Sequence, residues 1–243
     1  MIVGEQLMNK RYKIMDLSHK LYTDMPSYPN LPPFRIEFLK IAARDGSTVS
    51  MITSMHTHLG THIDFPLHVI PDSKSSDDYT LKDLSGEGVV IDLSYKNERE
   101  AITEEDLDKY SDYINIGGIV FLFTGWSNKR GVTQTYSFRW PYLEESAAHF
   151  LVKKGIRILG IDGLSVGGWG GKATIQEPAP KTASRKIHRI LLDAGILLVE
   201  EIANLDKVLM GKKVAKSFFV IAPLPIKGAE ASPCRVFSMV SDL

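Results

Sequence analysis

Apolar residues fall along this chain mostly in short runs, which predict strands. The runs within residues 88–93, 118–123, 156–161 and 196–199 are apolar almost throughout, as expected for buried strands. Residues 34–41 alternate between apolar and polar positions, and the turn signal Asp45-Gly46 separates them from a second strand at residues 49–57. These two segments therefore predict a hairpin. Further short strands are predicted at residues 12–17, 217–225 and 234–239, the last two as a closing hairpin.

Other segments carry the features of helices. Residues 142–154 have apolar side chains at helical spacing and are followed by Gly155, where a helix would end. Residues 103–106 combine a threonine cap with acidic residues in the first turn, and residues 184–193 begin with a serine that can cap a helix. A short helix is also predicted at residues 204–210. Strands and helices in this order predict one α/β (mixed α+β) domain over residues 1–243.

Three stretches show neither the apolar period of a strand nor that of a helix. Residues 25–33 contain four prolines, residues 127–141 are polar and aromatic, and residues 163–181 are rich in glycine and proline. The first must be an ordered, irregular loop or a linker, and a loop as long as the third is usually functional or disordered in a compact domain.

Composition excludes several classes of function. Lys plus Arg equals Asp plus Glu at 29 each, so the basic excess that binds nucleic acid or a membrane surface is missing. Cys234 is the single cysteine, which excludes an internal disulfide and a thiolate metal site. No apolar run approaches the ~18 residues of a membrane span, and the first residues lack the apolar core of a signal peptide. We therefore expect a cytoplasmic protein.

The chemistry is concentrated in one segment. Four of the seven histidines (His56, His58, His62 and His68) lie within thirteen positions, with Asp64 among them. Imidazole and carboxylate are the groups that Zn²⁺ and similar divalent metals bind. His62 and Asp64 share one face of an extended segment, and a glycine lets the chain turn between His58 and His62. The segment therefore predicts a metal site, in which His56 is either a neighbour of the ligands or an ordinary surface or core histidine.

The string H-x-G-T-H-x-D-x-P-x-H occurs at residues 58–68 without a mismatch and resembles the signature of the metal-dependent cyclase family. That family includes bacterial kynurenine formamidases (arylformamidases) and isatin hydrolases. The resemblance extends over nearly the whole chain and implies a swivelling β/β/α fold. It also implies hydrolysis of a C–N bond in a small aryl formamide or cyclic amide by metal-activated water.

The resemblance further implies the metal ligands. The family has a histidine in a helix and a glutamate at the end of the following short strand, which His188 and Glu200 match. One ion would bind His58, His62, Asp64 and Glu200, and a second would bind Asp64, His188 and Glu200. The site would hold one or two ions of Zn²⁺ or Mn²⁺, although such ligands also accept Fe²⁺ or Co²⁺.

Two further assignments complete the predicted centre. The family uses the last histidine of the motif, here His68, as the acid/base, and an imidazole with a pKa near ~6.5 suits that task. Glu201 is the rival of Glu200, but strand alternation points the two side chains in opposite directions. We therefore favour Glu200 as the ligand.

Substrate contacts are predicted from aromatic residues. Tyr28 stands where kynurenine formamidases place a stacking tryptophan, and Phe65 lies inside the motif, so both are predicted to line the pocket. The three tryptophans are candidates as well, although ordinary packing is the better explanation for any one of them. The departure at Tyr28 leaves isatin-like lactams and small esters open as substrates. The resemblance also implies a homo-oligomer, a dimer or tetramer.

Two alternatives compete with this interpretation. The segment Gly163-Leu-Ser165-Val-Gly167 fits the G-x-S-x-G elbow of serine hydrolases, but more glycines follow where that elbow needs a helix. A non-catalytic metal-binding protein would have no use for an acid/base such as His68 beside its ligands.

Overall fold

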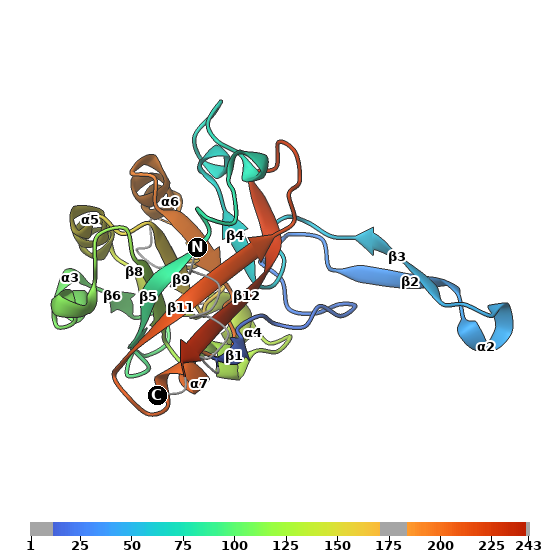
Figure 1. Cartoon of the computed structure of the whole chain (residues 1–243), viewed down its shortest axis with the longest axis horizontal. Helices are drawn as coiled ribbons and strands as arrows, with labels where there is room; N and C mark the ends of the chain where they lie inside the picture. Colours follow the sequence, from blue (N-terminus) through green and yellow to red (C-terminus); the bar gives the residue numbers. More distant parts are fainter. Residues whose placement is uncertain (1–11, 171–183, 242–243) are drawn as a thin grey trace, which may run out of the picture.

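Eight strands form the central sheet of the computed structural model, which describes residues 12–170 and 184–241. Their order in the sheet is β1 (Tyr12–Asp16), β12 (Ala231–Ser241), β11 (Val214–Pro223), β5 (Ser85–Asp92), β7 (Ile119–Phe123), β9 (Ile158–Ile161), β10 (Leu197–Glu200) and β4 (His62–Asp64). Because β4 pairs with both β10 and β12, the sheet curls back on itself into a barrel-like ring (Figure 1). This arrangement confirms the predicted mixed α/β fold.

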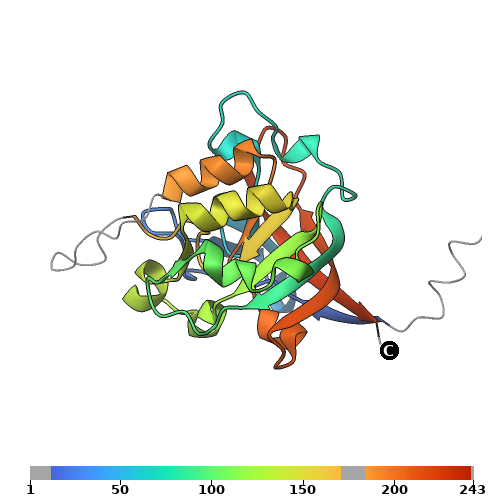
Figure 2. The same ribbon diagram turned by 90° about the vertical axis from the view of Figure 1, so that its left-hand side faces the viewer.

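Helices cover one side of this sheet. Strands β5, β7, β9 and β10 are parallel neighbours, and α3 (Glu104–Asp108), α5 (Glu145–Lys154) and α6 (Ser184–Asp193) belong to the connections between them. Figure 2 shows α5 and α6 lying side by side across the strands. A short helix, α7 (Leu205–Leu209), packs against β5 and β11. The helices cover one face of the parallel strands and the barrel interior covers the other. Covering on both faces explains why these strands are apolar throughout.

Two apolar cores result, and strand β10 contributes to both of them. Leu197 and Val199 point into the barrel interior with Phe121 and Phe219, whereas Leu198 packs against the helices. Alternation then places Glu200 on the helix side as well. The end of β10 therefore carries an acidic side chain toward α6.

Several predicted boundaries were wrong. The strand expected at residues 49–57 ends at Ser54, so His56 and His58 lie in the loop that follows it. Tyr142–Leu143 forms β8, which pairs with β6 (Ala101–Ile102), and α5 begins only after it. Residues 127–141 contain most of η4 (Trp126–Lys129) and the whole of α4 (Gln134–Phe138). These helices are too short to show an apolar period.

The remaining short elements are η1 (Pro66–His68), η2 (Ser76–Asp78) and η3 (Ser111–Tyr113). The helix predicted near residue 103 is confirmed, with Thr103 and Asp106 forming a capping box. Of the long loop predicted at residues 163–181, residues 171–181 lie outside the described ranges. No helix in the described part of the chain is long and apolar enough to cross a lipid bilayer.

The predicted hairpin is confirmed, but it stands apart from the barrel. Strands β2 (Arg35–Lys40) and β3 (Val49–Ser54) pair only with each other, and α2 (Ala42–Asp45) forms the tip. Figure 1 shows this unit projecting far from the body. We call residues 35–54 the arm.

Candidate metal centre

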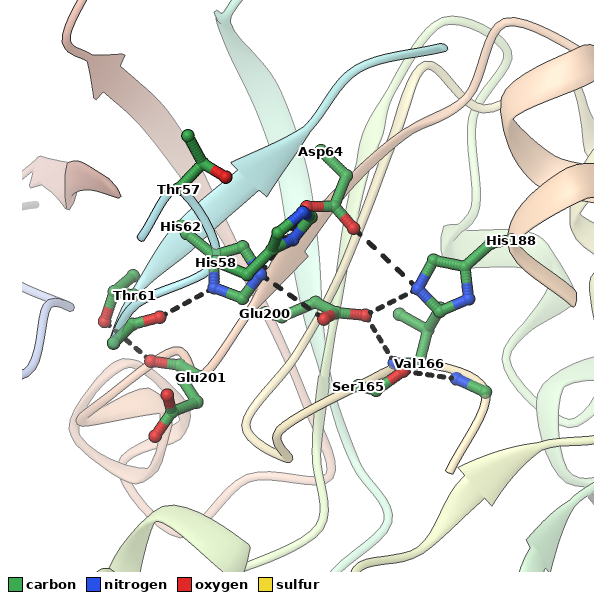
Figure 3. Close-up of polar contacts among 12 residues, drawn as sticks. Thr57, His58, Thr61, His62, Asp64, Ser165, Val166, His188, Glu200 and Glu201 are labelled. Atoms are coloured by element: carbon green, nitrogen blue, oxygen red, sulfur yellow. Dashed lines mark hydrogen bonds and ion pairs between the residues drawn. The ribbon is translucent and has the colours of Figure 1, made fainter. Parts of the chain in front are cut away.

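Strands β4 and β10 bring two distant parts of the sequence together. In their antiparallel register Glu200 lies opposite His62, and Leu198 lies opposite Asp64. His62 Nε2 is 3.4 Å from Glu200 Oε2 and 3.5 Å from Asp64 Oδ1. All three side chains are buried and point to the same point in space (Figure 3). The prediction that His62 and Asp64 share a face therefore agrees with the structure.

Helix α6 contributes His188 from above the sheet. Its Nε2 atom lies 3.2 Å from Glu200 Oε1 and 3.7 Å from Asp64 Oδ2. Its Nδ1 atom donates a hydrogen bond to the carbonyl oxygen of Ser184, at 2.8 Å. Because a carbonyl only accepts, this bond fixes Nδ1 as the protonated nitrogen and leaves Nε2 facing the carboxylates.

A hydrogen bond to a backbone carbonyl also orients His62. Its Nδ1 atom donates to the carbonyl oxygen of Gly60 at 2.7 Å, so Nε2 faces Asp64 and Glu200. Gly60 has φ +58°, the left-handed conformation that the tight turn before His62 requires. This turn also returns His58 toward the centre, with Nδ1 2.9 Å from Asp64 Oδ1.

His68 follows on η1 and completes a cluster of imidazoles. Its ring centroid is 4.4 Å from that of His58 and 5.5 Å from that of His188. Among the described residues, two groups have potential ligand atoms all within 4.8 Å of one another. One group is His58, Asp64 and His68, and the other is His62, Asp64 and Glu200. Asp64 belongs to both groups, as expected for a carboxylate between two ion positions.

The electrostatics of the cluster fit a cation. Asp64 is fully buried, yet neither of its oxygens has a well-aligned hydrogen bond to any described residue, and the same holds for His62 Nε2. Burial of polar atoms without partners is costly unless another group satisfies them. A divalent ion would satisfy these atoms, so the donor set present here fits a metal.

The pKa values show how the imidazoles compensate for the two acids. Burial raises the pKa of Asp64 and Glu200, but the surrounding histidines more than reverse this, lowering the pKa of Glu200 to about 2 and that of Asp64 as well. Burial likewise disfavours protonation of His58 and His188, but the carboxylates raise their pKa values to about 10 and about 8. The two acids thus stay ionised, and protonated imidazoles neutralise them.

Glu200 and Glu201 point in opposite directions. The Val166 backbone N–H donates to Glu200 Oε1 at 2.7 Å, which holds that carboxylate in the centre. Glu201 has φ +51°, and its carboxylate accepts a 2.6 Å hydrogen bond from Tyr136 Oη and lies 3.5 Å from Arg130 Nε. Glu201 is therefore outside the cluster and belongs to a buried network behind it.

That network also supports the motif loop. Thr61 Oγ1 donates to the backbone carbonyl of Glu201 at 2.6 Å and accepts the His19 N–H at 2.9 Å. Because Thr61 precedes His62 and Glu201 follows Glu200, the bond ties together the two chain segments that carry the candidate ligands (Figure 3).

Two further histidines and Ser165 are outside both groups of potential ligands. His56 is held by a 2.8 Å hydrogen bond with Ser27 Oγ, and His149 is exposed on α5. Ser165 Oγ lies 3.5 Å from the hydroxyl of Ser184 and makes no hydrogen bond to a histidine within the described part of the chain. Its loop instead delivers the Val166 N–H to Glu200. The arrangement therefore does not form a serine nucleophile elbow.

A cavity of about 830 Å³ opens above the cluster. Its walls include Tyr28, Leu164 and Trp169, and the rings of Tyr28 and Trp169 meet edge to face at 5.6 Å. Phe65 does not line it: strand alternation sends Phe65 into the barrel core, where it stacks on Tyr79. The prediction that placed Phe65 beside a substrate thus disagrees with this geometry.

Trp126 and Trp140 are almost completely buried, as ordinary packing predicts. The sequence did not predict that Glu230 belongs to the site. It lines the cavity, lies 3.3 Å from His58 Nε2, and accepts a 2.6 Å hydrogen bond from Thr57 Oγ1. A single glutamate in a loop so far along the chain gives no local signal.

Comparisons with known proteins agree with this geometry. Residues 15–167 match the model of a family described as putative cyclase. The chain is 32% identical over 225 residues to a kynurenine formamidase of Geobacillus thermodenitrificans, covering 91% of this chain and 94% of that one. A kynurenine formamidase of Bacillus anthracis is 30% identical over 227 residues, covering 93% and 97%.

Among solved structures, isatin hydrolase A from Labrenzia aggregata superposes with a TM-score of 0.80 at 27% identity, covering 95% of this chain and 94% of that one. A structure described as a potential metal-dependent hydrolase with cyclase activity gives a TM-score of 0.72 at 28% identity, covering 94% and 98%.

Proposed function

Because this chain belongs to the putative cyclase family, we propose that it is a metal-dependent amidohydrolase that cleaves a C–N bond of a small aryl formamide or cyclic amide. The observation that carries the proposal is the convergence of His62, Asp64 and Glu200 on one buried point at the floor of the cavity. The names of the kynurenine formamidase and isatin hydrolase relatives support the same type of bond.

We assign the metal ligands as follows: His58, His62, Asp64 and Glu200 for one ion, and Asp64, His188 and Glu200 for a second. Zn²⁺ or Mn²⁺ is the expected metal. When bound, such an ion lowers the pKa of water and polarises a carbonyl oxygen. The hydrogen bonds from His62 and His188 to backbone carbonyls hold the two rings in the ligating tautomer.

His68 is the proposed acid/base. Burial lowers its pKa below the usual value, so the ring is neutral near pH 7 and can accept a proton. The same ring can then return that proton to the leaving nitrogen. His68 lies in the wall of the cavity, where a substrate can reach it.

The cavity favours a flat, apolar substrate. Tyr28 and Trp169 offer aromatic surfaces from two loops, and Leu31 and Leu164 add apolar walls. An aryl formamide and a fused lactam both present such a flat ring, and the fold shared with isatin hydrolase A supports the lactam as the second candidate. We also infer a cytoplasmic location, which rests on the sequence.

A hydrolysis panel tests the proposal. Purified protein should hydrolyse an aryl formamide or an isatin-type lactam, lose activity with a chelator, and regain it with Zn²⁺ or Mn²⁺. Metal content should be measured on the same samples. Absence of hydrolysis across formamides, lactams and esters with the site fully metal-loaded would leave a non-catalytic metal-binding protein as the better account.

The variant His68→Ala tests the acid/base role. It should retain the metal content of the native protein but lose turnover, whereas loss of metal would make His68 a ligand, as its proximity to His58 and Asp64 allows. His149→Ala is the matched control because that histidine is exposed on α5. Ser165→Ala should keep most activity, since no nucleophilic serine is required.

A further inference from the structure

Glu230 reaches the metal centre through the closure of the sheet. It comes directly before β12, and in the pairing of β12 with β4 Ala231 lies opposite Asp64. The Glu230 carbonyl oxygen accepts the Phe65 N–H at 2.9 Å, so the Glu230 backbone is fixed beside the strand that carries two candidate ligands. Its side chain lines the cavity and is 37% exposed. Glu230 is therefore a rigidly placed acid at the edge of the centre.

The Glu230 carboxylate contacts two consecutive residues of the loop that leads into β4. Its Oε1 atom accepts a 2.6 Å hydrogen bond from Thr57 Oγ1 and lies 3.3 Å from His58 Nε2. A hydroxyl that donates to a carboxylate at this distance makes a strong bond, so Thr57 fixes the direction of the acid. The carboxylate is thereby held against the His58 ring.

The His58 ring is turned the opposite way from the rings of the other two histidine ligands. His62 and His188 each donate from Nδ1 to a backbone carbonyl and present Nε2 to the carboxylates of the centre (Figure 3). In His58 it is Nδ1 that lies 2.9 Å from Asp64 Oδ1. Its Nε2 atom points away from the centre, and the acceptor beside it is Glu230 rather than a backbone carbonyl.

An acid beside a ligating histidine has two effects on a metal site. An imidazole that binds an ion through one nitrogen keeps a proton on the other, and an acceptor at that second nitrogen fixes the tautomer and the direction of the ring. A charged acceptor makes a stronger hydrogen bond than a neutral carbonyl and raises the basicity of the ligand. Of the three histidine ligands, His58 is thus the one whose orientation depends on another side chain.

We propose that His58 binds its ion through Nδ1 and that Glu230 is the positioning residue that keeps the proton on His58 Nε2. Glu230 accepts a hydrogen bond from this N–H and does not bind the ion, in agreement with its place outside both groups of potential ligands. The assignment rests on the metal centre of the proposed function, but it is independent of the substrate and of the reaction.

Zinc binding by three variants tests the assignment. Glu230→Ala removes the acceptor, and Glu230→Gln keeps an acceptor oxygen but removes the charge. Glu100→Ala is the matched control, because Glu100 is also 37% exposed and paired, with Lys96 at 3.1 Å, but does not line the cavity. The Zn²⁺ affinity of each metal-free protein is measured by competition with a chromophoric chelator. Far-UV circular dichroism checks that each variant is folded.

Glu230→Ala should lower the Zn²⁺ affinity by about 10–100-fold, the usual effect of removing a group that orients a metal ligand. Glu230→Gln should recover part of this loss, and Glu100→Ala should bind zinc like the native protein. Unchanged zinc affinity in Glu230→Ala, with only KM raised, would make Glu230 a substrate contact and overturn the proposal. A native protein that binds no Zn²⁺ would instead refute the metal centre itself, so the two failures are distinguishable.

The tautomer of His58 provides a second readout, which a general loss of stability would not mimic. Long-range ¹H–¹⁵N spectra of the zinc-loaded native protein with labelled histidine show which nitrogen of each ring carries the proton. One zinc-bound ring, that of His58, should be protonated at Nε2, whereas His62 and His188 should be protonated at Nδ1. Spectra in which every zinc-bound ring is protonated at Nδ1 would overturn the proposal. This measurement needs no variant, so it decides the question even if Glu230→Ala does not fold.

Discussion

The buried network behind the metal centre can be tested by removing a single oxygen atom. Tyr136 is fully buried, and its hydroxyl donates a 2.6 Å hydrogen bond to the Glu201 carboxylate. Glu201 is itself 2% exposed, and its other close partner is Arg130 at 3.5 Å. The variant Tyr136→Phe keeps the ring and removes only the hydroxyl.

The expected loss of stability follows from the charge on the acceptor. A hydrogen bond to a buried charged group contributes about 1.5–3 kcal/mol, and the carboxylate left behind remains desolvated. We therefore expect the free energy of unfolding to fall by about 2–3 kcal/mol in metal-free protein. Urea denaturation followed by tryptophan fluorescence measures this directly.

The network should also affect metal binding, because Thr61 ties the Glu201 backbone to the loop that carries His62. Groups that orient metal ligands typically change affinity by about 10–100-fold, so Tyr136→Phe should weaken binding by at least ~10-fold. Isothermal titration with Zn²⁺ provides the measurement. Tyr113→Phe is the control, since Tyr113 is 44% exposed. Reduced stability with unchanged metal affinity would show that the network supports the fold without positioning the ligands.

Three further predictions concern other parts of the molecule. Gly88→Ala should destabilise the fold by about 2–3 kcal/mol, because the added carbon would lie 2.2 Å from the Ile119 carbonyl oxygen. Gly131→Ala is the control and should change stability little, since the nearest atom to its added carbon would be 3.8 Å away. Thermal unfolding of both variants measures the difference. Burial would raise the pKa of Asp106, but Lys96 Nζ at 2.6 Å helps to hold it at about 2, so its contribution of roughly 2 kcal/mol is present above pH ~4 and is lost as the pH falls toward 2. The stability difference between native protein and Asp106→Asn should shrink over that range, and a constant difference would contradict the assignment. Metal binding near pH 7 should release protons from His58 and His188, because their pKa values are raised, so metal affinity should increase with pH. Calorimetry in buffers of different ionisation enthalpy counts the released protons. Zero release would contradict the assigned ligands.

Local patterns in the sequence predicted much of the fold and of the cluster. Apolar runs located the parallel strands, and alternation gave the shared face of His62 and Asp64 and the opposite directions of Glu200 and Glu201. The same alternation directs Phe65 to the same face as Ile63, into the barrel core, and so argues against the predicted place of Phe65 in the pocket. Pairing of β4 with β10 could not be derived locally, because it depends on closure of the whole sheet.

Other features leave no local trace in the sequence. Glu230 reaches His58 across a separation of more than 170 positions, and the Val166 N–H that holds Glu200 is a backbone group. The arm shows the limit most clearly. Alternation at residues 34–41 predicts a strand, but it does not tell whether either face of that strand meets the same chain.

Closure of the barrel and the candidate metal centre both depend on strand β4. The three residues of β4 join β10 to β12, and two of them, His62 and Asp64, are candidate ligands. An ion held by β4, β10 and α6 would therefore stabilise the closed ring by binding only the folded state, by about 4 kcal/mol at a thousand times its dissociation constant. Without metal, the protons on His58 and His188 reduce the repulsion between Asp64 and Glu200, and the sheet can close before an ion arrives.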